Sequence, residues 1–246
     1  VLAPYTPRRW RKRAWRLEQS VCRDARHVIT TNPAAAELMQ QRHGRSDHVS
    51  VLTQGYDDRN TSHERLAWMF DPNHIELFYS GSFYQFRNPD SLLRALAVDP
   101  RIRLSIAAIT VPESVLAAAR SMPEQIRLLG FMPHLDVVAM QKHAHVLVNI
   151  ANEDASQIPG KVFEYLGAGR PILHLCNQPD DAISALLSEL GKGWSCQNNE
   201  HEISDWLRTI CLGGDINLPT GAKGISAHSW RNIALKLEEI LLGCKT

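Results

Sequence analysis

The sequence of 246 residues has few of the features that mark metal, redox, membrane or nucleic-acid-binding proteins. Its 5 cysteines are widely scattered, and no two have metal-ligand or redox spacing, which favours a reducing, cytoplasmic compartment. Lysine and arginine total 27 against 26 aspartate and glutamate, and this near-neutral balance argues against nucleic acid as a partner. No apolar run approaches the ~20 residues of a membrane span.

Clusters of metal ligands are also scarce. The 11 histidines form no H-x-x-x-H pair, and no Asp-x-Asp motif is present. The adjacent pairs Asp57–Asp58 and Asp180–Asp181 are interpreted as solvated turn residues. We therefore expect no metal site.

The sequence does contain short apolar runs that alternate with helical patterns. The runs are rich in Val, Ile and Leu, which predicts strands buried on both faces. Several intervening segments begin at Asn-Pro or Pro and end near Gly, as helices do. The expected strands are 27–30, 48–52, 75–80, 103–109, 126–130, 144–150, 171–175 and 193–196. Their alternation with helices predicts an α/β fold with a Rossmann-like, doubly wound parallel sheet.

Two loops after predicted strands are candidates for a site, because ligands of such sheets bind beyond the carboxyl ends of the strands. In "GSFYQFRNPD", Gly81 allows close approach of a ligand, and Arg87 precedes a helix start where it can hold a phosphate. A solvated arginine beside an ordinary glycine turn explains this loop equally well. In "GFMPHLD", Gly130 and Pro133 form a turn into a helix that can face a nucleobase, although a plain turn is the simpler interpretation.

A third loop, "ANEDASQIPGKVFEYLGAG", runs into a predicted helix that begins at Pro159 and Gly160. Lys161 lies in the first turn, where a cation opposes the helix dipole. This local conflict indicates an anionic ligand that compensates for it. Glu164 follows one turn later. From the residues alone, a carboxylate on the surface of the helix is the favoured interpretation of Glu164.

The segment "IPGKVFEYLGAGRPIL" resembles the donor-site segment of retaining glycosyltransferases with the GT-B fold (group 1, family 4-like), of the bacterial surface-polysaccharide type. Members of that group often have P-x-K-x-x-E-Y-x-A-x-G-x-P here. Other stretches resemble the family in the same order along nearly the whole chain. They are "ARHVITTNPAAAELM", "VSVLTQGYDD", "LFYSGSFYQFRNPDSLLRAL", "IRLLGFMPHLDVVAMQKHAHVLVNI" and "SWRNIALKLEEIL".

The resemblance implies a division of the chain. Residues 1–58 match the end of the N-terminal, acceptor-side domain with the interdomain linker. Residues 59–225 match the C-terminal, nucleotide-sugar donor-binding domain, and 226–246 match the closing helix. Because the sequence begins in a basic stretch without an initiating Met, we expect its first part to be missing.

The resemblance also implies a function. The expected activity is metal-independent, retaining hexosyl transfer from a UDP-sugar or GDP-sugar to a glycan or lipid-linked acceptor, in polysaccharide or lipopolysaccharide biosynthesis. No cofactor besides the donor substrate is expected. Two alternatives stay open: a non-catalytic nucleotide- or carbohydrate-binding module, and a nucleotide-sugar epimerase on the same fold.

Particular residues match the family's site. Glu164 matches the carboxylate that binds the ribose hydroxyls. Lys161 and Gly160 are expected to face the diphosphate, and Arg87 matches the basic residue that stabilises the leaving diphosphate. Arg87 and Lys161 are thus the expected catalytic residues.

Further positions are expected to bind the donor: Gly81, Ser82 and Phe83 in the cleft, and Gly130 and Phe131 by the nucleobase. The sequence departs from the family at two of its positions. Ser156 occupies the place of a sugar-binding Glu, and Ser82 the place of a common Arg.

The start of the chain is basic, with six Arg or Lys between Arg8 and Arg16 and two tryptophans, Trp10 and Trp15. Such a segment is compatible with peripheral docking on the inner face of an anionic membrane. The favoured interpretation is a helix that packs within the N-terminal domain.

Overall fold

The computed structural model describes residues 7–59, 70–71, 73–84, 86–152, 157–179, 181–212 and 224–244. Two compact units comprise Val1–Gln54 with Arg231–Thr246, and Gly55–Trp230. The expected domain limits after residues 58 and 225 stay a prediction. No helix among the described residues is both long and apolar enough to cross a membrane.

The first unit pairs two short strands with helices. Its elements are α1 (Arg8–Asp24), β1 (Val28–Thr30), α2 (Pro33–His43), β2 (Val49–Val51) and nearly all of α9 (Trp230–Gly243). The strands β1 and β2 are parallel. The predicted Asn-Pro start of α2 is confirmed, because the side chain of Asn32 accepts a hydrogen bond from the backbone N–H of Ala35 at 2.8 Å.

The second unit is built on a parallel sheet of six strands in the order β5-β4-β3-β6-β7-β8. The strands are β3 (Ile75–Ser80), β4 (Ile102–Ala107), β5 (Ile126–Leu128), β6 (Val146–Ile150), β7 (Ile172–Cys176) and β8 (Gly193–Gln197). The helical segments are α3 (Asp90–Ala95), η2 (Leu96–Val98), α4 (Glu113–Ser121), α5 (His134–His143), α6 (Gly160–Ala168), α7 (Ala182–Leu190), α8 (Glu200–Cys211) and η3 (Ile225–His228). This arrangement confirms the expected α/β fold.

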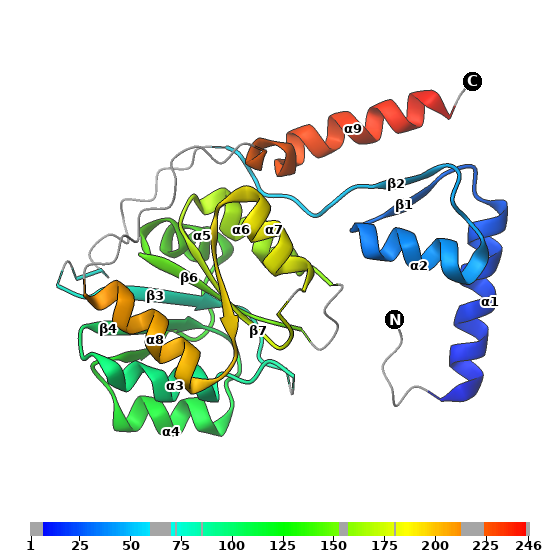
Figure 1. Ribbon diagram of the computed structural model, residues 1–246. Coiled ribbons are helices and arrows are strands. Elements are labelled where there is room, and N and C mark those ends of the chain that lie inside the picture. The colour runs from blue at the N-terminus through cyan, green and yellow to red at the C-terminus, as the bar shows by residue number, and fades with distance from the viewer. Residues whose placement is uncertain are drawn as a thin grey trace. The chain divides into compact units, whose positions relative to one another are not determined.

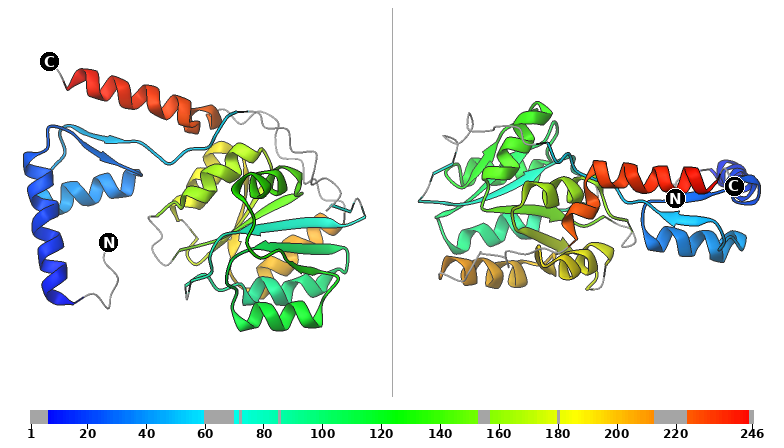
Figure 2. Two further views of the ribbon diagram at one scale, coloured as in Figure 1. Left: turned by 180° about the vertical axis from the view of Figure 1, so that it is seen from behind. Right: turned by 90° about the horizontal axis from the view of Figure 1, so that it is seen from above.

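Helices cover both faces of this sheet (Figure 1). The helices α3, α4 and α8 pack on one face, where Leu92, Val115 and Leu207 join a buried cluster with strand residues. The helices α5, α6 and α7 pack on the other face, in a second buried cluster (Figure 2). Because both faces are covered, β6 and β7 are buried along their whole length, as their richness in Val, Ile and Leu predicts.

The amino-terminal edge of the sheet carries a buried ion cluster. Glu76 on β3 is inaccessible to solvent, and it accepts hydrogen bonds from Nη1 of Arg103 at 3.1 Å and from Nη2 of Arg127 at 2.8 Å. Arg127 also donates from Nε to the hydroxyl of Ser105 at 3.0 Å. The cluster ties β3, β4 and β5 together at the edge opposite the strands' carboxyl ends.

The structure corrects the interpretation of Asp181 as a solvated turn residue. Asp181 is buried at the start of α7, where it accepts from the backbone N–H of Ser184 at 2.7 Å. Its other oxygen lies 2.8 Å from Nε2 of the buried His174. Although burial opposes its ionisation, the hydrogen bond with His174 helps to hold the pKa of Asp181 below its ordinary value. The buried partner of Asp181 in β7 could not be predicted from the local sequence, because the two residues meet only through packing of α7 on the sheet. Asp180 lies outside the described residues.

Candidate functional site

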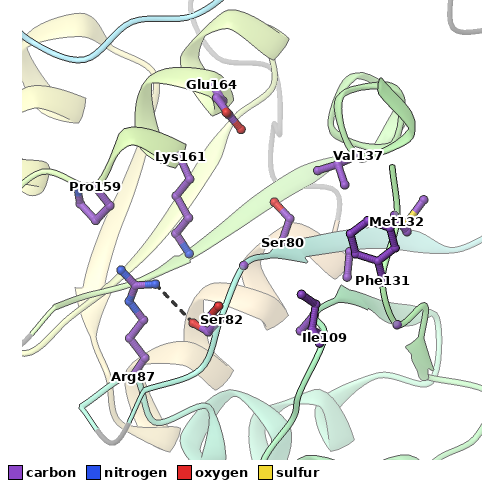
Figure 3. Close-up of a pocket in the computed structure, with 14 residues that line it drawn as sticks. Ser80, Ser82, Arg87, Ile109, Phe131, Met132, Val137, Pro159, Lys161 and Glu164 are labelled. Atoms are coloured by element: carbon purple, nitrogen blue, oxygen red, sulfur yellow. Dashed lines mark hydrogen bonds between the residues drawn. The ribbon is translucent and has the colours of Figure 1, made fainter. Parts of the chain in front are cut away.

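The strand order places a switch point between β3 and β6, where successive strands of the chain are added in opposite directions. A cavity of about 380 Å³ lies at the carboxyl ends of these strands, and we call it the switch-point cavity (Figure 3). It is lined by Ser80, Gly81, Ser82, Arg87, Ala107, Ala108, Ile109, Gly130, Phe131, Met132, Val137, Pro159, Lys161 and Glu164. The three loops selected from the sequence therefore meet at one cavity.

The loop after β3 holds Arg87 in a fixed position. Gly81 has a φ of +127°, a backbone conformation that side-chain-bearing residues rarely adopt, and this lets the chain turn sharply at the end of the strand. Arg87 is only 9% exposed, and its Nη1 donates to the backbone carbonyl of Ser82 at 3.3 Å. The same carbonyl accepts from the hydroxyl of Tyr79 at 3.1 Å. The loop thus closes on itself and presents the guanidinium to the cavity (Figure 3).

Lys161 reaches into the cavity from the first turn of α6. Its Nζ is buried and has no hydrogen-bond partner among the described residues. It lies 4.2 Å from the centroid of the Tyr79 ring and 5.9 Å from that of Tyr165. Burial, and then the positive charge of Arg87, hold the pKa of Lys161 well below its ordinary value.

The helix α6 brings its amino terminus and Glu164 to the same cavity. Pro159 precedes the helix, and no side chain caps its first turn. On the buried side, the hydroxyl of Tyr165 accepts from the backbone N–H of Ser80 at 3.0 Å and so fixes α6 to the end of β3. Glu164 lies one turn beyond Lys161 and lines the cavity on the side of α6 (Figure 3).

The opposite side of the cavity is apolar. Gly130 has a φ of +64°, and the loop that it begins presents Phe131 and Met132 to the cavity. Phe131 is 75% exposed and Ile109 is 79% exposed, although both are large apolar side chains. Figure 3 shows them across the cavity from Lys161 and Arg87. The site therefore has a cationic end and an apolar end.

Most of the residues predicted to bind the donor line this cavity: Gly81, Ser82, Arg87, Gly130, Phe131, Lys161 and Glu164. Gly160 is the first residue of α6, next to Lys161, but does not line the cavity. The ring of Phe83 stacks on that of Tyr79, with 4.6 Å between the ring centroids. Phe83 lines a neighbouring cavity, and Arg87 lines both cavities. Ser156 lies outside the described residues.

Two side chains that hold the cations, Tyr79 and Asn152, are not among the residues predicted from the sequence. Tyr79 supplies the ring face beneath Lys161. In the sequence it looks like an ordinary buried residue of a strand. Burial raises its pKa to about 12, so the hydroxyl stays protonated and donates to Ser82. Asn152 accepts two hydrogen bonds from Arg87. Its position just after β6, at the carboxyl edge of the sheet, was the signal that could have identified it.

The geometry fits an elongated ligand with an anionic end and a flat, weakly polar end. Two cations and the free N–H groups of a helix start can neutralise phosphate charge. The carboxylate of Glu164 on α6 can accept hydrogen bonds from hydroxyl groups, and exposed apolar side chains can pack on a ring.

No family model and no curated protein sequence matches this chain. Solved structures of similar fold do exist. HepE from Anabaena, in complex with UDP, has a TM-score of 0.78 at 15% identity over 99% of this chain and 70% of HepE. Sucrose-phosphate synthase from Thermosynechococcus elongatus has a TM-score of 0.72 at 14% identity, over 97% of this chain and 63% of that protein.

A third solved structure is WaaG, a glycosyltransferase involved in lipopolysaccharide biosynthesis. Its TM-score is 0.59 at 14% identity, over 75% of this chain and 53% of WaaG. These neighbours are glycosyltransferases of the GT-B fold, and at such identities the likeness shows the fold alone. The second unit therefore has the architecture of a GT-B domain.

Proposed function

We propose that this chain is the donor-binding part of a glycosyltransferase that uses a nucleoside-diphosphate sugar. The observation that carries the proposal is the buried Nζ of Lys161, which has no hydrogen-bond partner among the described residues and lies near Arg87. Burying two cations side by side is costly unless an anion joins them. A diphosphate supplies that charge, and the apolar end of the cavity accommodates a nucleobase.

In this proposal each part of the donor has its own contacts. The diphosphate lies between Arg87, Lys161 and the amino terminus of α6. Glu164 accepts hydrogen bonds from the ribose hydroxyls. The nucleobase packs beside Phe131, near Gly130.

The proposed mechanism is metal-independent transfer with retention. The bond between the sugar and the diphosphate breaks, and negative charge develops on the leaving diphosphate. Fixed cations and helix N–H groups stabilise that charge without having to reorganise during the reaction. Arg87 and Lys161 therefore serve catalysis as well as binding.

The solved neighbours support the choice of donor and of pathway. HepE has been crystallised with UDP and with UDP-glucose, and WaaG acts in lipopolysaccharide biosynthesis. We propose a glycan or lipid-linked acceptor in bacterial polysaccharide or lipopolysaccharide biosynthesis. The cytoplasmic location proposed with it agrees with the 5 free cysteines. Docking of α1 on the membrane stays a prediction.

Calorimetric titration of the chain with UDP, GDP and their sugars tests the proposal. We expect at least one of these nucleotides to bind, and we expect binding to depend on its diphosphate. If none binds, both the glycosyltransferase and the epimerase functions are excluded. A transfer assay with a bound donor and a set of acceptors then separates an enzyme from a non-catalytic binding module.

Substitution Glu164→Ala is expected to weaken UDP binding by about tenfold, because the ribose hydroxyls lose a charged acceptor. The measurement is the dissociation constant of wild type and variant for UDP and for 2′,3′-dideoxy-UDP, which lacks the ribose hydroxyls. The variant should bind the two ligands equally, whereas the wild type prefers UDP.

The matched control is Glu189→Ala, which removes an exposed glutamate from α7, outside the cavity. It should bind UDP like the wild type. A Glu164→Ala variant that still prefers UDP over the dideoxy nucleotide contradicts the ribose assignment while leaving the diphosphate site intact.

A further inference from the structure

We infer that Asn152 is a positioning residue that orients Arg87 toward the phosphates while leaving its positive charge unneutralised. The inference rests on the proposed function, since it concerns how the same site recognises a diphosphate. Asn152 does not line the switch-point cavity and is not among the site residues predicted from the sequence.

The hydrogen bonds of Arg87 show how it is held. Its Nε and Nη2 both donate to Oδ1 of Asn152, at 3.0 and 2.6 Å. Its Nη1 donates to the backbone carbonyl of Ser82 at 3.3 Å. The guanidinium carbon also lies 5.0 Å from the centroid of the Tyr84 ring. All of these partners are neutral.

Lys161, the second cation of the cavity, also has only neutral groups around it among the contacts of the described residues. Lys161 lies over the rings of Tyr79 and Tyr165, and no described carboxylate lies within ion-pair distance of Lys161 or Arg87. Glu164 lines the same cavity without pairing with either. The cationic end therefore keeps its charge available for a ligand.

Two partly buried arginines on the strands of the sheet have a charged partner instead. Arg103 and Arg127 both pair with the carboxylate of Glu76 at 3.1 and 2.8 Å. A carboxylate is the strongest usual partner for a guanidinium, because it is planar and can bind it in a bidentate way through two parallel hydrogen bonds. At Arg87 the single oxygen of an amide accepts from two N–H groups, so the guanidinium is held without a neutralising charge.

Asn152 is itself fixed to the sheet. The neighbouring Ala151 donates its backbone N–H to the carbonyl of Leu175 at 2.9 Å, which continues the pairing of β6 with β7. The backbone carbonyl of Asn152 accepts from the side chain of Asn177 at 3.4 Å. The amide that holds Arg87 is thus anchored at the carboxyl ends of β6 and β7.

The test is Asn152→Asp, which keeps the shape of the side chain and strengthens its hydrogen bonds to Arg87. If Asn152 only supports the structure, this variant should bind ligands as well as the wild type does. If its neutrality matters, the new carboxylate neutralises Arg87 and repels the phosphates. We expect about tenfold weaker binding of UDP, a smaller loss for UMP and no change for uridine.

The control for added charge is Asn199→Asp, outside the cavity. Asn199 caps α8 through Oδ1, which accepts from the backbone N–H of Glu202 at 3.0 Å, and aspartate caps helices equally well. This variant should bind UDP, UMP and uridine like the wild type. The melting temperature of Asn152→Asp should not fall, because an ion pair with Arg87 replaces a neutral contact.

Three results would overturn the inference. They are wild-type UDP affinity in Asn152→Asp, an equal loss for uridine and UDP, and an equal loss in the Asn199→Asp control. A wild-type chain that binds none of UDP, GDP, UMP and uridine overturns the proposed function as well. Failure of the inference and failure of the proposed function are thus separate outcomes.

Discussion

Substitution Lys161→Met is expected to weaken binding of UDP by about 10- to 100-fold while making the folded protein more stable. The loss of affinity follows from removing a charged hydrogen-bond donor to the diphosphate, since hydrogen bonds to charged groups contribute about 1.5–3 kcal/mol. The gain in stability follows because a buried nitrogen with no hydrogen-bond partner among the described residues gives way to an apolar side chain of similar length. Isothermal titration and thermal denaturation measure the two effects.

The lowered pKa of Lys161 fixes the sign of the pH dependence. In the free protein the side chain loses its proton well below its ordinary pKa of about 10.4, and a bound diphosphate raises that pKa again. Binding therefore takes up a proton between these two values, and UDP affinity falls as the pH rises through that window. Below the lowered pKa, affinity should not depend on this group.

Proton uptake can be measured directly from binding enthalpies in buffers of different ionisation enthalpy. From pH 8 upward the terminal phosphate is already ionised, since its last pKa is about 6, so it contributes little to the uptake. In a series of pH values from about 8 to about 10, the wild type should take up protons within the window between the two pKa values of Lys161, and Lys161→Met should not. Equal uptake by both proteins contradicts the assignment.

The same shift predicts how the stability of the wild type changes with pH. In the unfolded chain Lys161 holds its proton up to about 10.4, whereas in the folded protein it loses it earlier. The unfolded state thus binds more protons between the two values, and stability rises with pH there relative to Lys161→Met. At neutral pH the variant should be the more stable protein.

A matched control for Lys161→Met is Lys192→Met. Lys192 precedes β8 at the amino-terminal edge of the sheet, where its backbone carbonyl accepts from Ile172 at 3.0 Å. This variant should keep UDP affinity, proton uptake and their pH dependence. If Lys161→Met lowers stability, or binds UDP like the wild type, the view of Lys161 as a cation kept for a ligand is wrong.

Much of the fold follows from local sequence pattern. The segment 75–80 is predicted as a strand and is β3 in the structure, and each other predicted strand overlaps an observed one. Continuous Val, Ile and Leu runs make these strands recognisable, because both faces of the sheet are covered. The segment 200–211 forms α8 but is not among the predicted helices, although Asn199 and Glu202 provide a helix-start signal there.

The site was predictable in part, for a physical reason. Lys161 conflicts with the helix dipole, and that conflict can be seen in the sequence alone. The partners of Arg87 could not be seen, because Asn152 lies 65 positions away and reaches Arg87 only through sheet pairing. The ring of Tyr79 under Lys161 depends likewise on which face of β3 meets α6. Local conflicts mark functional positions, whereas their supporting contacts are set by tertiary structure.

The largest expected loss of stability is for Glu76→Gln, at about 3 kcal/mol in the free energy of unfolding. Glu76 is inaccessible to solvent and is the carboxylate that pairs with both Arg103 and Arg127. Glutamine keeps the size of the side chain but removes the carboxylate charge that Arg103 and Arg127 share. Burial lowers the pKa of Arg127 even with Glu76 beside it, so removing that carboxylate further disfavours the charged guanidinium. Urea denaturation of wild type and variant measures the difference.

Two further variants distinguish the effect of burial on stability from the effect of losing an ion pair. Glu113→Gln breaks an exposed pair with Arg120, whose side chains are 75% and 67% exposed, and it should cost under about 1 kcal/mol. Replacing Glu76, Arg103 and Arg127 together by leucine removes the buried charges as well as the pairing, so it should cost less than Glu76→Gln alone. If Glu76→Gln is no more harmful than Glu113→Gln, the cluster at the amino-terminal edge does not hold β3, β4 and β5 together. The contrast with Arg87 would then be lost, because removing the Glu76 carboxylate would cost Arg103 and Arg127 little.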